Sequence, residues 1–170
     1  AAKKVVGDVR HHASFDEMLK TSPDIVWLAT PTPLHADHSI KALQHGIHVF
    51  CEKPMTATLD EAREVKNWVD KTNHVFNVGF FLHFGKGIQM MKQLIDEKKL
   101  GNILHVYARV GTYITLVNSL SRYQAHHPGS LFFDYSHQVD LMYWLLQKRP
   151  ASVYVSAFSS GDMQFSSSPN

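Results

Sequence analysis

Residues 47–54 read Ile-His-Val-Phe-Cys-Glu-Lys-Pro, a short apolar strand that leads directly into an acid, a base and a proline. Gly46 and Pro54 bound the run, as is typical of a buried parallel strand. Glu52 and Lys53 therefore follow the carboxyl end of a strand, where open α/β sheets bind their ligands. Pro54 restricts Lys53 to extended backbone, or allows a cis bond that turns the lysine outward. An ordinary exit from strand to loop explains the same residues, so the surrounding pattern has to decide.

Helices and strands alternate on both sides of this stretch. Two capping boxes, Ser14 with Glu17 and Thr58 with Glu61, indicate helix starts. The sequence predicts helices over 15–20, 34–45 and from Thr58 to 71, and strands over 24–29, from Ile47 and over 75–81. This order is typical of a parallel sheet with right-handed crossovers. The first half of the chain thus has the pattern of the later part of a doubly wound nucleotide-binding domain.

The glycine-rich phosphate loop of such domains is not found in the sequence. No G-x-G-x-x-G follows a predicted strand, and no acid stands at the distance needed for a ribose contact. Gly85 and Gly87 are followed by Met90 at the third glycine position, so they indicate a helix start. Either the domain binds no dinucleotide, or its first strand and loop lie outside this sequence.

The second half of the chain has a different pattern. The elements predicted here are a helix over 88–98, alternating strands over 103–113 and 151–158, and between them a helix capped by Ser136. We expect the apolar face of that last helix to consist of Val139, Met142, Tyr143 and Leu146.

Composition excludes two classes of partner. The 17 Lys and Arg nearly balance the 15 Asp and Glu, and the basic residues are scattered, so we expect no nucleic acid partner. No apolar run approaches the roughly 18 residues that span a bilayer, so we expect no membrane partner. The lone cysteine, Cys51, cannot form an internal disulfide, which favours a reducing compartment and a cytoplasmic location.

The twelve histidines raise the question of a metal site. The pairs His11–His12 and His126–His127 are adjacent and do not share a face. His35 and His38 could share a helix face, but no acid or cysteine stands beside them in a metal-binding spacing. We therefore predict no metal, and an unrelated α/β protein with a histidine metal site is the least favoured hypothesis.

A second chemical cluster lies at the start of the predicted helix near residue 136. His137 follows Asp134 by three residues and precedes Asp140 by three. The ordinary pKa of histidine, near 6.5, suits proton transfer, and a carboxylate can orient the ring and stabilise the imidazolium. A capping aspartate beside a surface histidine is the alternative interpretation, because helix starts are rich in acids.

Four blocks together resemble one family. They are Ala29–His35 (Ala-Thr-Pro-Thr-Pro-Leu-His), Gly46–Pro54, Gly101–Ile103 (Gly-Asn-Ile) and Asp134–Asp140 (Asp-Tyr-Ser-His-Gln-Val-Asp). In order and spacing they are similar to the glucose–fructose oxidoreductase and inositol dehydrogenase family (Gfo/Idh/MocA), over nearly the whole chain. The resemblance implies an α/β chain in which residues 1–81 form the C-terminal part of a Rossmann, doubly wound parallel sheet. Residues 82–170 would then form part of an α+β domain with a mainly antiparallel sheet.

The same resemblance implies an NAD(P)-dependent dehydrogenase that acts on a sugar, an inositol or a related polyol. The implied cofactor is NAD or NADP, and the implied assembly is a homo-oligomer, a dimer or tetramer, formed through the sheet of the second domain. The implied cofactor-binding residues are Thr30, Pro31, His35, Glu52, Lys53 and Pro54.

The resemblance also implies the catalytic and substrate-binding residues. His137 would take the hydroxyl proton, Lys53 would hold the oxygen, and Asp134 or Asp140 would fix the tautomer of the histidine. The implied substrate-binding residues are Lys53, Tyr113, Arg122, Tyr123, Asp134 and His137. The chain differs from many members in two respects: Asp134 stands three rather than four residues before His137, and His83 stands where many members have an arginine. A non-catalytic relative that binds a sugar or nucleotide, or acts as an assembly module, is the alternative function.

Overall fold

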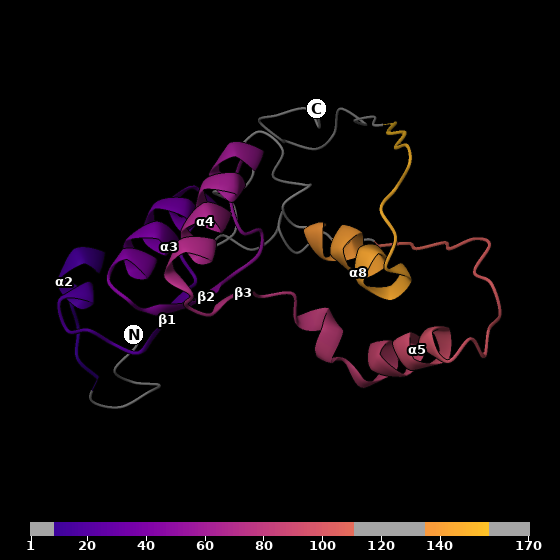
Figure 1. Cartoon of the computed structure of the whole chain (residues 1–170), viewed down its shortest axis with the longest axis horizontal. Coiled ribbons are helices and arrows are strands. Elements are labelled where there is room, and N and C mark those ends of the chain that lie inside the picture. The colour runs from indigo at the N-terminus through magenta and orange to yellow at the C-terminus, as the bar shows by residue number, and fades with distance from the viewer. Residues whose placement is uncertain (1–8, 111–134, 157–170) are drawn as a thin grey trace, which may run out of the picture. The chain divides into compact units, whose positions relative to one another are not determined.

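The computed structural model describes residues 9–110 and 135–156 of the chain (Figure 1). It divides into two compact units, Ala1–Gly79 and Phe80–Asn170. Tyr113, Arg122, Tyr123 and Asp134, four of the predicted site residues, lie outside the described residues.

In the described part of the first unit, a parallel sheet of three strands forms the centre. Its strands are β1 (Ile25–Leu28), β2 (His48–Cys51) and β3 (Phe76–Val78), in the order β1-β2-β3. Both pairs are parallel, and Val49 is paired with Val26 of β1 and with Phe76 of β3. The predicted parallel sheet is confirmed, although each end strand is shorter than predicted.

Two helices connect these strands in the way that parallel pairing requires. Helix α3 (His35–Gln44) joins β1 to β2 after a short 3₁₀ turn, η1 (Thr32–Leu34), and α4 (Leu59–Thr72) joins β2 to β3. The Thr58 hydroxyl accepts from the Glu61 N–H while the Glu61 carboxylate accepts from the Thr58 N–H, so this capping box is confirmed.

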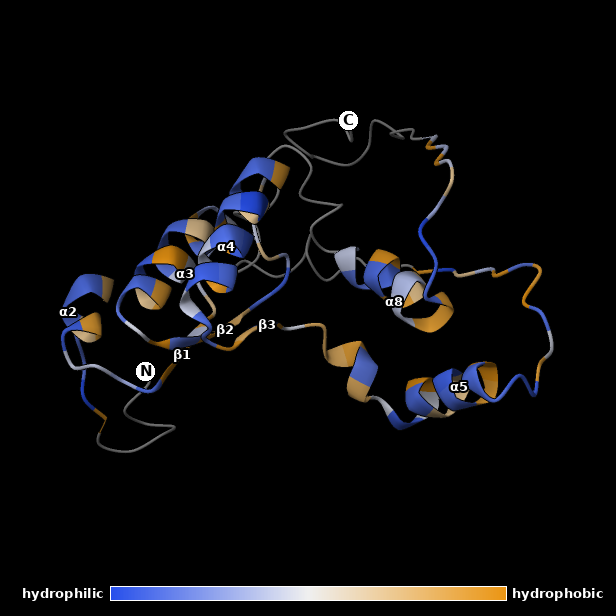
Figure 2. Ribbon diagram, viewed as in Figure 1, coloured by the Kyte–Doolittle hydropathy of each residue, from blue (hydrophilic) through white to orange (hydrophobic). Residues whose placement is uncertain are grey.

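The hydrophobic core of the first unit lies on one side of the sheet. It consists of Leu19, Val26, Leu28, Ala42, Leu43, Ile47, Val49 and Cys51, with Trp68, Val69 and Phe76 among the side chains packed against it. Outward residues of α4 are mainly hydrophilic (Figure 2). On the other side of β1, Ile25 and Trp27 are 60% and 70% exposed. Only alternate residues of β1 are therefore buried, although its run of apolar residues resembles that of a fully buried strand.

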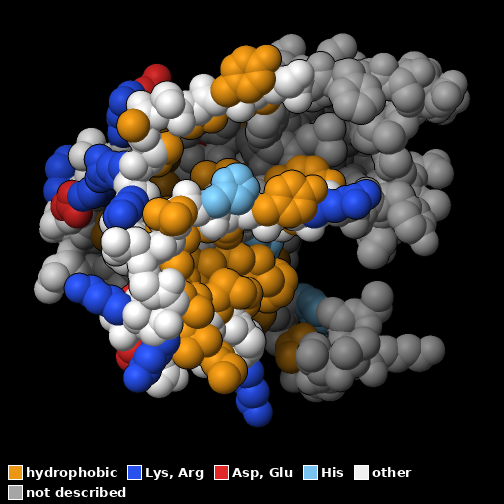
Figure 3. All heavy atoms as spheres, turned by 90° about the vertical axis from the view of Figure 1, so that its right-hand side faces the viewer, with side chains coloured by type: hydrophobic (Ala, Val, Ile, Leu, Met, Phe, Trp, Pro, Cys, Tyr) orange, Lys and Arg blue, Asp and Glu red, His pale blue; other side chains and the backbone are white. Residues whose placement is uncertain are grey.

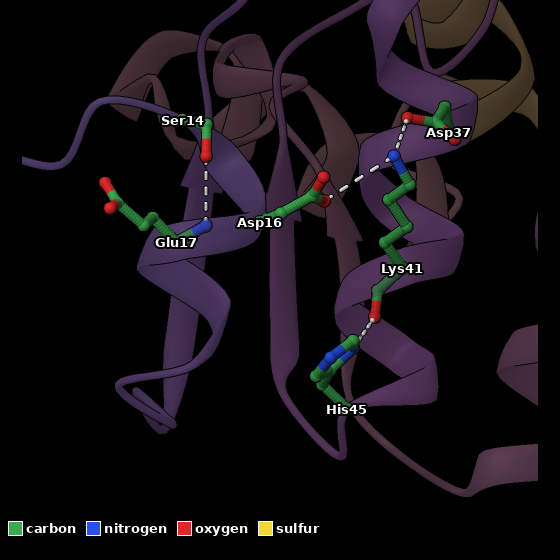
Figure 4. A network of polar contacts seen from close by, with 6 residues as sticks. All are labelled: Ser14, Asp16, Glu17, Asp37, Lys41 and His45. Atoms are coloured by element: carbon green, nitrogen blue, oxygen red, sulfur yellow. Dashed lines mark hydrogen bonds and ion pairs between the residues drawn. The ribbon is translucent and has the colours of Figure 1, made fainter.

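A small polar network attaches the first described helix, α2 (Phe15–Leu19), to α3 (Figure 4). Ser14 caps α2 by accepting from the Glu17 N–H at 3.1 Å. The ammonium of Lys41 lies 2.9 Å from the Asp37 carboxylate on its own helix and 3.6 Å from that of Asp16 on α2. Its hydrogen bond to Asp37 raises the pKa of Lys41.

The second unit contains three described helices: η2 (Phe81–Phe84), α5 (Lys86–Asp96) and α8 (Ser136–Leu146). Gly85 is the N-cap of α5, so the helix start predicted there is confirmed. The cap predicted for α8 is wrong, since Ser136 is its first residue and Tyr135 takes the N-cap position.

The apolar face predicted for α8 is also wrong. Val139 and Tyr143 are 75% and 50% exposed, whereas His137 and Leu145 are the buried residues of this helix. Polar and aromatic contacts of α8 with η2 and α5, described below, decide which side of the helix is covered.

The strands predicted over 103–113 and 151–158 do not form in their described parts, 103–110 and 151–156. An alternating sequence forms a strand only beside a partner strand, and side chains such as Leu104 and Tyr154 are more than 90% exposed here. The antiparallel sheet of the second domain therefore stays a prediction. Figure 3 shows hydrophobic side chains gathered at the surface on the face that it presents.

No helix in the described residues is long and apolar enough to cross a membrane.

Candidate functional site

The loops that follow all three strands lie at one edge of the sheet, because the strands are parallel. Thr30 and Pro31 follow β1, Glu52, Lys53 and Pro54 follow β2, and Gly79 follows β3. This is the edge at which open α/β sheets bind ligands. The Lys53–Pro54 peptide bond is cis, one of the two geometries that the sequence allows.

His35 lies beneath two of these loops. It is the first residue of α3 and its side chain is only 1% exposed. Its Nδ1 lies 2.8 Å from the carbonyl oxygen of Pro54, and its Nε2 lies 2.7 Å from that of Thr30. The structure thus brings Thr30, His35 and Pro54, all predicted to bind the cofactor, into one cluster.

Glu52 and Gly79 are in close contact at the same edge. A Cβ placed on Gly79 would lie 3.1 Å from Glu52 Oε2, closer than side chains normally approach one another. Any larger residue at position 79 would have to displace the carboxylate. The sequence shows Gly79 only as part of a predicted strand, and no local signal reveals its contact with a residue 27 positions earlier.

The polar groups at this edge fit a dinucleotide. The Thr30 hydroxyl is buried and has no hydrogen-bond partner among the described residues. Such a group is satisfied if a ligand supplies a hydroxyl or phosphate oxygen. Together with the Glu52 carboxylate and the Lys53 ammonium, it offers the acceptor and donors that ribose and phosphate groups require.

The cysteine at the end of β2 is excluded as a nucleophile. Cys51 is fully buried, and its thiol lies 3.4 Å from the Glu52 carbonyl oxygen and 3.8 Å from that of Met55. Burial raises the pKa of this thiol to about 12. Because the thiolate is the reactive form, Cys51 is inert at neutral pH.

His137 belongs to the second unit, where it lies in the first turn of α8 and is 7% exposed. Its ring packs edge-on against two aromatic rings, at centroid distances of 5.8 Å from Phe80 and 4.6 Å from Phe81. Aromatic walls of this kind restrict the orientation of the imidazole. The predicted proton-transfer residue is therefore a packed histidine, whereas the alternative interpretation expected one on the surface.

One turn further along α8, Asp140 pairs with a histidine that precedes α5. Its Oδ2 lies 2.6 Å from His83 Nε2, and the His83 ring stacks on Trp144 at a centroid distance of 4.6 Å. The ammonium of Lys92 on α5 also lies over the Trp144 ring, 5.8 Å from its centre. Local sequence signals did not reveal this cluster, because its members are brought together from three separate helices.

The described residues contain no group of three or more histidine, cysteine or acidic side chains that could hold a metal ion.

Comparison with known proteins agrees with this arrangement. Residues 2–80 match the family model described as an oxidoreductase family with an NAD-binding Rossmann fold. Residues 88–164 match the model of the GFO/IDH/MocA C-terminal domain. The chain belongs to the Gfo/Idh/MocA oxidoreductase family.

The sequence identity between this chain and individual relatives is moderate. An uncharacterised oxidoreductase of Streptococcus pneumoniae is 29% identical over 143 residues, which cover 83% of this chain and 39% of the relative. An inositol 2-dehydrogenase of Salmonella paratyphi B is 27% identical over 133 residues, which cover 78% of this chain and 38% of the relative.

Among solved structures, scyllo-inositol dehydrogenase from Lactobacillus casei, with bound NAD(H) and scyllo-inositol, superimposes with a TM-score of 0.76. It is 27% identical, and the match covers 87% of this chain and 45% of that one. The chain thus spans less than half the length of each of these three proteins.

Proposed function

We propose that this chain is part of an NAD(P)-dependent oxidoreductase that acts on a CH–OH group of a sugar, an inositol or a related polyol. The observation that carries the proposal is the cluster at the carboxyl edge of the sheet. There the loops after β1 and β2 hold the Thr30 hydroxyl, which has no partner within 9–110 and 135–156, the carboxylate of Glu52 and Lys53 at the edge where this class of sheet binds ligands. Similarity to inositol dehydrogenases supports the substrate class.

In this proposal Thr30, Pro31, Glu52, Lys53 and Pro54 bind NAD or NADP, with His35 beneath them. A nicotinamide cofactor supplies the hydride acceptor or donor when it is bound. The ammonium group of Lys53 holds the substrate oxygen and stabilises negative charge that develops on it. His137 takes the substrate hydroxyl proton on a ring nitrogen and returns it in the reverse direction.

The remaining predicted residues belong to the substrate side of the proposal. Tyr113, Arg122, Tyr123 and Asp134 are proposed to bind substrate hydroxyls, and Asp134 is proposed to assist His137. Asp140 takes a different role from the one that the sequence suggested, because its carboxylate pairs with His83.

A turnover assay tests the proposal. The protein is mixed with NAD or NADP and a panel of inositols and aldoses, and formation of the reduced nicotinamide is followed by its absorbance. We expect turnover with at least one pair, and a loss of about 100- to 1,000-fold in the Lys53→Ala and His137→Ala variants. Lys66→Ala, which removes an exposed lysine of α4, is the matched control and is expected to keep full activity.

The alternative function is a separate outcome of the same assay. A parent protein that binds a dinucleotide or a sugar, measured by calorimetry, but turns over nothing in the panel would contradict the oxidoreductase proposal. It would support the non-catalytic relative instead.

We also propose a homo-oligomer that forms through the second domain, and a cytoplasmic location. Exposed apolar side chains in residues 103–110, among them Leu104, Val106 and Tyr107, support the first. The free, buried thiol of Cys51 supports the second. Analytical ultracentrifugation tests the oligomer, and a monomer at micromolar concentration would contradict it.

A further inference from the structure

The ring of His35 makes two contacts that one neutral imidazole cannot satisfy. Nδ1 and Nε2 lie 2.8 Å and 2.7 Å from two backbone carbonyl oxygens, both within hydrogen-bond range. A carbonyl oxygen only accepts, so each contact needs a proton on the ring nitrogen. Neutral imidazole carries one ring N–H, whereas the imidazolium carries two.

Leaving the second contact without a proton would be unfavourable at this place. The side chain is 1% exposed, so a lone pair facing the carbonyl would have no access to water. With a proton on both nitrogens, each contact becomes a charge-assisted hydrogen bond, about twice as strong as a neutral one.

The two carbonyls belong to the loops that carry the proposed cofactor contacts. The backbone hydrogen bonds between β1 and β2 end with the one from the Glu52 N–H to the Leu28 carbonyl oxygen, at 2.9 Å. Beyond that bond, the His35 ring connects Thr30 after β1 with Pro54 after β2. Lys53 lies in the short segment between the last ladder bond and this connection.

We propose that His35, with a proton on each ring nitrogen, is a positioning residue that ties the loop after β1 to the loop after β2 and so fixes the backbone at Lys53. It acts through these loops and touches neither cofactor nor substrate. Its effect on turnover rests on the proposed function, whereas the protonation of its ring does not.

The first test measures the ring itself. Nitrogen-15 NMR of the labelled protein near neutral pH, with His35 assigned by the signals missing from the His35→Gln variant, reports whether each ring nitrogen carries a hydrogen. We expect one-bond couplings from both nitrogens. A proton on only one ring nitrogen would overturn the inference, whether or not the protein has activity. The measurement is made on the parent protein, so it is decisive even if the variant does not fold.

If that variant does not fold, the signals are assigned by through-bond correlation to the His35 backbone. The kinetic test then uses His35→Asn, whose shorter amide reaches at most one of the two carbonyls.

The second test separates positioning from direct contact. Both N–H groups of a glutamine amide are on one nitrogen, whereas the two N–H groups of the imidazolium point in different directions from two separate ring atoms, so His35→Gln keeps at most one of the two bonds. We expect kcat to fall by about 10- to 100-fold, because misplacement of a reacting group lowers the rate of the chemical step, while the Kd for the dinucleotide changes far less.

His45→Gln is the matched control. His45 follows the same helix, and its Nδ1 donates to the Lys41 carbonyl of that helix. This variant is expected to retain both kcat and Kd. A His35→Gln protein with unchanged kcat and a raised dinucleotide Kd would overturn the inference in favour of direct cofactor contact.

If the parent protein shows no turnover, the proposed function fails while the NMR result still decides the state of His35.

Discussion

The two units of this chain have similar proportions of apolar residues, but they bury these residues to different extents. In the first unit, Leu43, Val49 and Val65 are at most 1% exposed, and the sheet and its helices enclose a continuous core. In the second unit, the described residues bury only His137 and Leu145, and Leu104 is 93% exposed. An apolar pattern thus becomes a core only where a second element covers it, since the hydrophobic effect scales with the area removed from water.

The largest expected effect concerns the accessibility of thiols in the two units. Cys51 is buried and its pKa is raised to about 12, so we expect it to react with a disulfide reagent only when the first unit unfolds. A cysteine introduced by Leu104→Cys in the second unit is exposed and should react at once. We expect rates that differ by about 1,000-fold or more, measured by reagent absorbance.

The pH dependence of folding follows from the same thiol. Its ordinary pKa of 9.0 in the unfolded chain lies below that of the folded chain, about 12. The folded state therefore holds the proton more tightly, and this contribution to stability is complete below pH 9 and lost as pH rises towards 12. A Cys51→Ala variant should lack this part of the alkaline decline in Tm. Rapid labelling of native Cys51 near neutral pH would contradict both expectations.

The next effect compares leucines of the two units. Leu43→Ala removes a fully buried side chain from the core and should lower the free energy of unfolding by about 2–5 kcal/mol. Leu104→Ala removes an exposed one and should change it by less than about 0.5 kcal/mol. Urea denaturation followed by circular dichroism measures both. Equal losses would mean that Leu104 is covered in solution, for example by a second copy of the chain.

A smaller effect tests whether polar contacts replace a core in the second unit. Asp140→Ala leaves His83, a half-buried partner, without its carboxylate and should cost about 1–3 kcal/mol. Hydrogen exchange of the α8 amides reports this loss locally.

Asp96→Ala is the control for that variant, because it removes a more exposed carboxylate from Lys92 and should cost below about 1 kcal/mol. If α8 exchanges equally in the parent and in Asp140→Ala, then the His83–Asp140 pair does not hold this helix.

The smallest effect concerns helix caps, which also differ between the units. Thr58 caps α4 through its side chain, so Thr58→Ala should cost about 1 kcal/mol. Gly85 caps α5 with no side-chain bond, and a Cβ there would make only ordinary contacts, 3.4 Å from the nearest atom. Gly85→Ser should therefore stabilise α5 by a few tenths of a kcal/mol.

Thermal unfolding measures both cap variants. A Tm that does not fall for Thr58→Ala, or that falls for Gly85→Ser, would contradict this account of the caps.

Signals within a few residues were sufficient for much of the first unit. The side-chain N-caps at Ser14 and Thr58, the glycine stop at Gly46 and the position of Lys53 after a strand could all be predicted from the sequence. Each depends on contacts between residues that are at most four positions apart, or on backbone limits of a single residue.

In the second unit, local sequence patterns predicted strands that the described residues do not form, and they predicted the wrong buried face of α8. Alternation over 103–113 predicted a strand, and its described part, 103–110, forms none, because a strand is completed by hydrogen bonds to a partner that the alternation does not contain. The apolar positions of α8 predicted the wrong buried face, because the covered side is set by contacts of His137 with Phe80 and Phe81 and of Asp140 with His83.

By itself, the sequence therefore determined the order of strands and helices in the first unit, their caps, and the chemical groups that follow each strand. Only the tertiary structure decided that Gly79 lies against Glu52, that Asp140 pairs with His83, and that His35 lies between the carbonyls of Thr30 and Pro54. The physical reason is distance along the chain. Propensity, capping and periodicity act between near neighbours, whereas these contacts join residues that become neighbours only when the chain folds back on itself.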